Sequence, residues 1–214
     1  MIYFFKKGLT NKIKYGNIIV SDTTKQNKLN EWRLNEMKKI EIVVAKDEIT
    51  VVGNRYLYGG NSKPMTKGDM MEAYIRKFLN PNDDKWYVKN SDSYDIASDI
   101  ETSMGEKISV KSGEFSLTEK LYATEYTESE KQRIITEYSK TVPSNLVAYA
   151  WLTNKNDDDY CINVVIVEMN VFIEFLRKNS VMTIIDTKTK RYKVKVKKAT
   201  STVIKELTRI ENGF

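Results

Sequence analysis

The chain has 214 residues, of which 41% are hydrophobic and 30% charged, and this suits one globular domain with a sizeable core. It contains no histidine and a single cysteine, which excludes Ser-His-Asp and Cys-His catalysis, histidine-based zinc sites and internal disulfides. A lone cysteine fits a reducing compartment, and no apolar run approaches the roughly 18 residues that span a bilayer. We therefore expect a cytoplasmic protein that does not contact membranes.

The predicted elements of the first third of the chain precede a clear loop. Apolar side chains at helical spacing indicate a first helix, and two apolar runs around Lys46-Asp47 indicate a pair of strands. The ranges are a helix over 26–39, paired strands over 40–45 and 48–53, and a loop over 58–64.

A second helix is predicted over 66–79. Thr66 is followed three residues later by Asp69, an acidic variant of the capping box, and apolar residues recur at helical spacing after it. Asn80-Pro81 ends the pattern.

Alternation between Tyr94 and Gly113 then predicts a β-hairpin with its turn around Gly105. One face of its first strand carries Asp95 and Asp99, and the returning strand sends Ser109 and Lys111 to the same face. A three-residue loop sets Asp99 opposite Ser109, whereas a five-residue loop sets it opposite Lys111.

The second half of the chain alternates helices with apolar strands. Ser116 with Glu119, and Thr127 with Glu130, form capping pairs that open two helices. Near-continuous apolar runs on both sides of a polar turn at 154–159 predict two buried strands. The predicted ranges are helices over 117–126, 129–140 and 168–178, and strands over 146–152, 160–167, 182–185 and 191–196. This order predicts one α/β domain with a central mixed sheet of about five or six strands and helices on both sides.

Positive charge is concentrated at the C-terminal end. Residues 181–214 hold nine Lys or Arg against three Asp or Glu, which accounts for the whole formal net charge of +6. Valines alternate there with a basic series, Lys193, Lys195 and Lys197. Such lysines either contact DNA phosphates or protect a sheet edge from aggregation, and the concentration of charge favours phosphate contact.

A carboxylate and a lysine held close together on rigid strands suit phosphodiester hydrolysis. The acid can hold Mg²⁺ through its oxygens, and the lysine can orient a water and offset charge on the phosphorane. The hairpin charges could also be an ordinary surface ladder. Because one acid is few for Mg²⁺, a second acid is expected nearby.

The hairpin motif resembles that of the PD-(D/E)xK nuclease superfamily, which includes most type II restriction endonucleases. The family has an Asp on one strand and then Glu-x-Lys or Asp-x-Lys on the next, and here Asp99 is followed after nine residues by Ser109-Val-Lys111. Ser109 departs from the usual acid and is similar to a Ser-x-Lys subset, which takes its second acid from a helix about thirteen or fourteen residues after the lysine. The matching residue is Glu125, with Glu119 as its rival on the same predicted helix.

The resemblance extends upstream to a helix with a glutamate directed at the site. Gly68 and Glu72 in the helix over 66–79 look like that element, so the helix–hairpin–helix order covers about sixty residues. The resemblance implies a restriction-endonuclease-like fold in a single nuclease domain over 1–214, with a catalytic core at about 66–170 and a basic strand region at 181–214.

The sequence therefore predicts a Mg²⁺-dependent endodeoxyribonuclease acting on double-stranded DNA, with a type II restriction enzyme and a homodimer implied by the resemblance, and with no organic cofactor. Asp99, or alternatively Asp95, and Glu125 or Glu72 would bind the metal, while Lys111 would position or activate the water. Two other readings stay open: a DNA-binding protein without catalysis, and a nuclease of the same fold that acts on branched or modified DNA.

Overall fold

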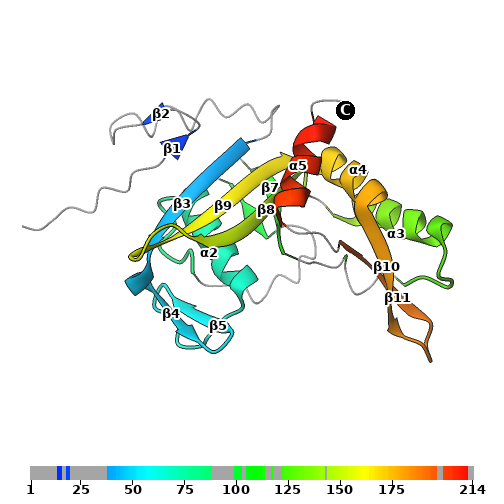
Figure 1. Ribbon diagram of the computed structural model, residues 1–214, viewed down its shortest axis with the longest axis horizontal. Coiled ribbons are helices and arrows are strands. Elements are labelled where there is room, and N and C mark those ends of the chain that lie inside the picture. Colours follow the sequence, from blue (N-terminus) through cyan, green and yellow to red (C-terminus); the bar gives the residue numbers. More distant parts are fainter. Residues whose placement is uncertain are drawn as a thin grey trace, which may run out of the picture.

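The computed structural model describes the chain in nine segments, which are residues 14–15, 18–19, 38–87, 99–102, 105–113, 117, 122–142, 144–196 and 200–211. The molecule combines α-helices with a curled mixed sheet (Figure 1). The predicted α/β class is therefore confirmed. None of the helices in the described segments is long and apolar enough to cross a membrane.

The centre of the fold is a five-stranded sheet with the order β3-β9-β8-β7-β6. Strands β7 and β8 run parallel, and every other neighbouring pair is antiparallel. The strands are β3 (Lys38–Ala45), β6 (Ile100–Glu101), β7 (Lys107–Ser112), β8 (Leu146–Asn154) and β9 (Asp159–Glu168).

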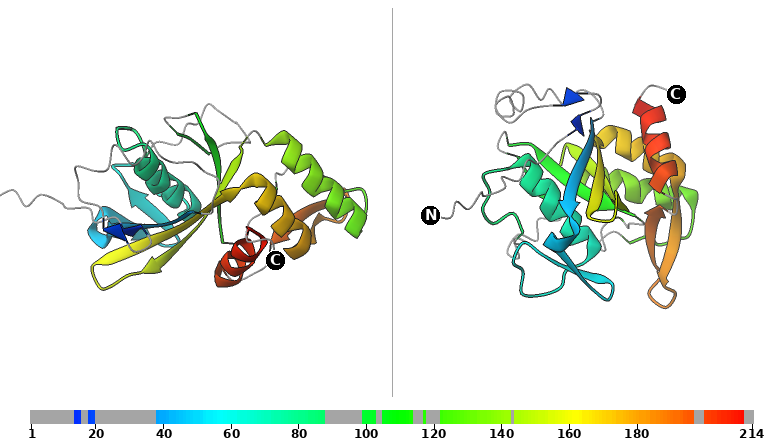
Figure 2. Two further views of the ribbon diagram at one scale, coloured as in Figure 1. Left: turned by 90° about the horizontal axis from the view of Figure 1, so that it is seen from above. Right: turned by 60° about the vertical axis from the view of Figure 1, so that its left-hand side comes forward.

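Helices cover both faces of this sheet, as Figure 2 shows. Helix α2 (Lys67–Leu79) packs on one face through a core that includes Ile108 and Ala148. Helices α3 (Glu128–Thr141) and α4 (Met169–Asn179) pack on the other, against Val147 and Val165. Helix α5 (Thr200–Glu211) joins the same core as α4. The alternation of each strand thus builds two separate cores.

Three antiparallel pairs lie outside the central sheet. They are β1 (Lys14–Tyr15) with β2 (Ile18–Ile19), β4 (Ile49–Val52) with β5 (Arg55–Tyr58), and β10 (Ser180–Asp186) with β11 (Arg191–Val196). A short 3₁₀ helix, η2 (Lys46–Glu48), separates β3 from β4.

The predicted pairing of residues 40–45 with 48–53 is wrong. Strand β3 pairs with β9 along its whole length, and β4 pairs with β5. The β3–β9 pair carries a continuous apolar face into the α2 core, and Lys46 N–H donates to the carbonyl oxygen of Asp158 at 2.8 Å, which holds the end of β3 against the β8–β9 turn. Gly53, at φ 62°, begins the tight turn that closes β4 onto β5.

Two predicted helices have different outcomes from the rest. The helix over 117–126 is wrong where the structure describes it, because residues 122–127 are not helical and Leu117 donates its N–H to Val194 of β11. The helix over 26–39 falls mostly outside the described residues, and Lys38 and Lys39 belong to β3. The predicted helices at 66–79, 129–140 and 168–178 are confirmed as α2, α3 and α4, with small shifts in their ends.

The capping box of α2 allows a direct test of the predicted start of this helix. Both of its hydrogen bonds are present between Thr66 and Asp69. We expect Thr66→Ala to lower the free energy of unfolding by about 1 kcal/mol, measured by denaturant titration, because one backbone N–H at the helix start loses its acceptor. Thr66→Ser keeps the acceptor and should match the wild type. An alanine variant as stable as the serine variant would contradict this role.

Candidate active site

The turn of the β6–β7 hairpin sets its register. Ile100 pairs with Ile108, and the Thr102 N–H donates to the carbonyl oxygen of Glu106 at 2.9 Å, so three residues lie between these two. Gly105, at φ 79°, adopts the left-handed conformation that such loops require. The observed register is the three-residue alternative predicted from the sequence, which brings Asp99 beside Ser109.

The Asp99 carboxylate lies against the backbone and side chains of β7. Its Oδ2 accepts the Val110 N–H at 2.6 Å and the Ser109 hydroxyl at 3.3 Å. The same oxygen lies 4.0 Å from Nζ of Lys111, and the two side chains are 34% and 19% exposed. The structure therefore brings together Asp99, Ser109 and Lys111, at a position that solvent still reaches.

The three residues belong to the face of the sheet that carries α3. Along β7, Ile108 and Val110 pack toward α2, so Ser109 and Lys111 point to the opposite face. Their neighbours on the parallel strand β8 are Val147 and Tyr149, both part of the α3–α4 core. Ser109 is only 2% exposed, so its hydroxyl is a buried polar group whose donor is satisfied by Asp99.

Tyr138 of α3 lies close to this cluster. It is 2% exposed, and its hydroxyl oxygen makes no hydrogen bond within the described part of the chain. Burial raises the pKa of Tyr138 to about 12, the nearby Ser109 hydroxyl opposes this rise, and the negative charge of Asp99 adds to it. The phenol is therefore neutral at physiological pH and is a hydrogen-bond donor beside the candidate site.

Helix α2 reaches the site through an arginine. Arg76 donates to the backbone carbonyl oxygen of Asp99 at 3.0 Å and to the carboxylate of Glu72 at 3.5 Å. Glu72 is 13% exposed, in a small pocket lined also by Tyr58, Trp86 and the Asp69 side chain. Arg76 thus joins the helical glutamate to the backbone of Asp99.

Glu125 does not occupy the predicted helix. It is exposed in the bent segment before α3, where the Thr124 N–H donates to the Glu130 carboxylate at 3.0 Å and Tyr126 donates to the carbonyl oxygen of Met182. These contacts hold the segment against β10 and the first turn of α3. Glu125 therefore does not lie on a helix, although the resemblance expects the second acid to come from one.

The described segments do not contain a group of three Asp, Glu, His or Cys side chains placed to hold one metal ion. Asp95, the alternative to Asp99, and Lys197 lie outside the described residues, as does Glu119. Lys193 and Lys195 are half-buried on β11.

Sequence reasoning did not single out Arg76 or Tyr138. Arg76 follows Glu72 by four residues, the spacing that places two side chains together on a helix. Tyr138 continues the buried stripe of α3 after Ile134 and Ile135. The first signal was available, whereas nothing in the second distinguishes a core tyrosine from one beside a site.

Comparison of the chain with protein-family models, with curated proteins and with solved structures found no match.

The unpaired Tyr138 hydroxyl gives a prediction with two parts. At neutral pH, Tyr138→Phe should change the free energy of unfolding by less than about 1 kcal/mol, because it removes a buried hydroxyl without a partner. Between pH 10 and 12 the unfolded phenol ionises first, so the wild type loses stability with rising pH. The phenylalanine variant should lose up to about 1.4 kcal/mol less per pH unit.

Chemical unfolding measured across this pH range tests both parts. A loss of more than about 2 kcal/mol for Tyr138→Phe at pH 7 would mean that the hydroxyl donates a hydrogen bond after all.

Proposed function

We propose that the protein is a Mg²⁺-dependent endodeoxyribonuclease that hydrolyses phosphodiester bonds in double-stranded DNA. The observation that carries the proposal is the convergence of the Asp99 carboxylate, the Ser109 hydroxyl and the Lys111 ammonium on one face of β7. An acid and a lysine on adjacent rigid strands form the arrangement that phosphodiester hydrolysis needs, since one holds a cation and the other faces the reacting phosphate.

Each residue has a role that follows from its contacts. The Val110 N–H and the Ser109 hydroxyl fix the Asp99 carboxylate through Oδ2. Lys111 lies beside this carboxylate, where its ammonium would orient the attacking water and offset the negative charge that builds on the phosphorane. Arg76 holds the backbone of Asp99 and so keeps the acid in register with the lysine.

The donor set of the site suits Mg²⁺ in the form that nucleic-acid enzymes use, with one or two carboxylates, several waters and substrate phosphate oxygens. The contacts of the Asp99 carboxylate in the described part of the chain all involve Oδ2, so Oδ1 is the oxygen suited to the cation. When bound, Mg²⁺ polarises the phosphate and lowers the pKa of its water.

A second carboxylate would come from Glu72 or from Asp95. Glu72 is joined to the backbone of Asp99 by Arg76, but α2 packs on the sheet face opposite Ser109 and Lys111, so its carboxylate would have to reach the ion around the edge strand β6. Glu125, the other helical acid predicted from the sequence, lies exposed in a segment held against β10.

We further propose a type II restriction enzyme that works as a homodimer, because two copies related by a two-fold axis cut both strands of a symmetric site. The order of α2 followed by the β6–β7 hairpin supports a restriction-endonuclease-like fold, although the third element of the resemblance, a helix over 117–126, is not helical where the structure describes it.

The second candidate is a DNA-binding protein without catalysis. The observation that favours it is that, within the described segments, no three acidic groups converge to hold a metal ion. The Asp99–Lys111 contact would then be a structural ion pair.

Cleavage of plasmid DNA distinguishes the two candidates. We expect Mg²⁺-dependent cleavage by the wild type, and a loss of about 10²–10³-fold in the cleavage rate for Lys111→Ala, since it removes the charge that faces the phosphate. Lys107→Ala is the matched control on the same strand, and it should cleave like the wild type. Full activity of Lys111→Ala, or no cleavage by the wild type, would overturn the proposal.

The choice of aspartate has its own test. Asp99→Asn should abolish cleavage in Mg²⁺ while leaving DNA binding intact, because it removes the carboxylate charge but retains a similar shape. If Asp99→Asn cleaves normally and Asp95→Asn does not, the metal carboxylate is Asp95.

A further inference from the structure

The β10–β11 hairpin extends away from the rest of the molecule (Figure 1). Its base is fixed in the core between α3, α4 and α5, because Met182, Val194 and Val196 are each at most 5% exposed. Its outer end, residues 184–191, carries exposed side chains. The hairpin is therefore a two-stranded ribbon with a rigid base and an accessible tip.

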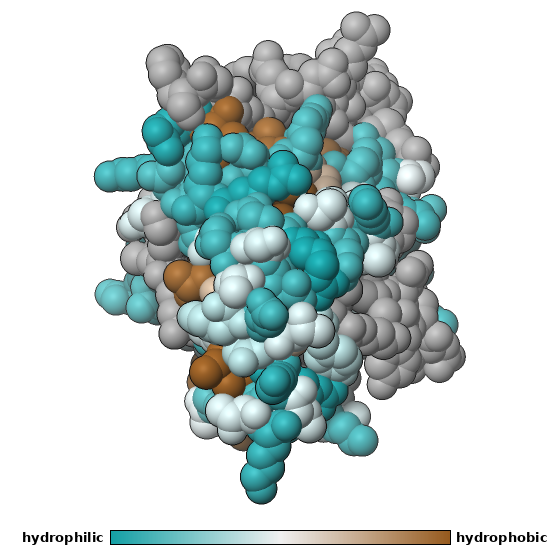
Figure 3. Space-filling view, turned by 90° about the vertical axis from the view of Figure 1, so that its right-hand side faces the viewer, coloured by the Kyte–Doolittle hydropathy of each residue, from teal (hydrophilic) through white to brown (hydrophobic). Residues whose placement is uncertain are grey.

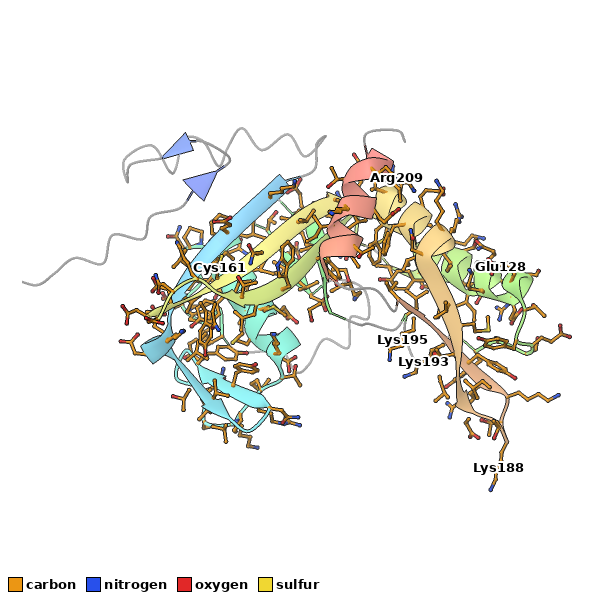
Figure 4. All side chains as sticks on the ribbon, viewed as in Figure 1. Glu128, Cys161, Lys188, Lys193, Lys195 and Arg209 are labelled. Carbon is orange, nitrogen blue, oxygen red and sulfur yellow. The ribbon has the colours of Figure 1, made fainter. Side chains whose placement is uncertain are left out.

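The tip is basic. Lys188, Lys190 and Arg191 are exposed there, and Lys188 extends from the end of the ribbon in Figure 4. The acid of the turn, Asp186, accepts the Thr189 hydroxyl at 2.7 Å and the Lys188 N–H at 2.9 Å, and these hydrogen bonds lower its pKa. The carboxylate therefore shapes the turn, and the three cationic side chains around it are exposed.

Aromatic side chains lie next to these cations. Arg191 stacks over the ring of Tyr122 at 4.4 Å, and Tyr126 contacts Tyr192 with ring centroids 5.6 Å apart. Tyr122 and Tyr126 are 44% and 57% exposed. The Tyr122 ring thus holds the Arg191 guanidinium at the surface by a cation–π contact.

The same hairpin is poorly suited to adding a strand from another protein chain at its base. Lys131 donates to the carbonyl oxygen of Ser180 at 3.2 Å, and Tyr126 donates to that of Met182, so side chains of the α3 region cover this edge of β10. Figure 3 shows a mainly hydrophilic surface on this side of the molecule, with small separate apolar patches. The exposed apolar residues of β10 are Val181, Ile184 and Ile185.

The hairpin also lies within reach of the candidate active site. The Leu117 N–H donates to the carbonyl oxygen of Val194 in β11 at 3.2 Å, and Leu117 lies only six positions after Lys111. An extended chain of six residues spans at most roughly 20 Å. Since one turn of B-DNA is about 34 Å long, a duplex that contacts β11 can reach Lys111 within a single turn.

From these observations we propose that the β10–β11 hairpin is the arm that docks double-stranded DNA, with the ribbon at the major groove and Lys188, Lys190 and Arg191 on the phosphates beside it. A two-stranded β-ribbon fits the major groove, which is about 12 Å wide. This inference rests on the proposed function for its substrate, but it concerns binding and is measured separately from cleavage.

The test compares two double variants that lose the same charge. Lys188→Ala with Lys190→Asn alters the tip, where asparagine tolerates the positive φ of 51° at position 190. Lys63→Ala with Lys155→Ala is the control, at two exposed lysines in loops at the far end of the sheet. Binding of a fluorescent DNA duplex is followed by anisotropy without divalent cations, from about 50 to 200 mM salt.

We expect the tip variant to bind more weakly and to show a salt dependence, log K against log salt concentration, shallower by about 2, because two phosphate contacts are lost. The control variant should match the wild type. Equal salt slopes for the two variants would show that the β10–β11 hairpin does not dock the duplex, even if the wild type cleaves DNA. If duplex binding depends on the tip but the wild type does not cleave DNA, the hairpin docks DNA and the proposed nuclease activity is wrong.

A second experiment uses vesicles of phosphatidylcholine with phosphatidylserine, since lysines beside exposed isoleucines also suit an anionic membrane. If the tip variant loses vesicle binding but retains duplex binding, the hairpin is a membrane-binding element and the inference is wrong.

Discussion

The register between β6 and β7 is the constraint on which the candidate site depends. It directs Ile108 into the α2 core and leaves Lys111 on the opposite face, beside Asp99. A slip of one residue would exchange these faces, and would press the lysine into an apolar core while exposing the isoleucine. Two hydrogen bonds to Asp99 oppose such a slip, one from the Val110 N–H to its carboxylate and one from Arg76 to its carbonyl oxygen.

Polar groups are buried next to β7, at positions where packing alone would favour apolar side chains. Ser109 is buried between β8 and α3, and the nearby Tyr138 hydroxyl lacks a hydrogen bond within the described segments. Buried polar groups without partners reduce stability, and they are found most often at sites that a substrate, ion or water completes. The edge position of β6 keeps Asp99 open to solvent, so charge and access are combined at one end of β7.

Much of the local structure could be predicted from the sequence, because short-range signals determine it. The Thr66 cap, the apolar run of β8 and the loop length that aligns Asp99 with Ser109 are all local. The β3–β9 pairing was not predictable in this way, since a strand can join any free sheet edge. The β4–β5 pairing has a local signal in the sequence, because Gly53-Asn54 is a typical two-residue hairpin connection. The predicted helix around Glu125 is wrong because the spacing from Lys111 gives only a distance along the chain, whereas tertiary contacts of the neighbouring residues decide the local structure.

In the proposed reaction Asp99 and Lys111 act together on one phosphate, and a metal ion would bind both the Asp99 carboxylate and the DNA. A crystal structure of the protein with a DNA duplex and Ca²⁺, which substitutes for Mg²⁺ as an oxygen-liganded cation, tests it most directly. We expect the ion on a carboxylate oxygen of Asp99, a phosphate oxygen as a further ligand, and the Lys111 ammonium turned toward that phosphate. A duplex bound with its phosphates away from β7, and Asp99 still paired only with Val110, Ser109 and Lys111, would contradict it.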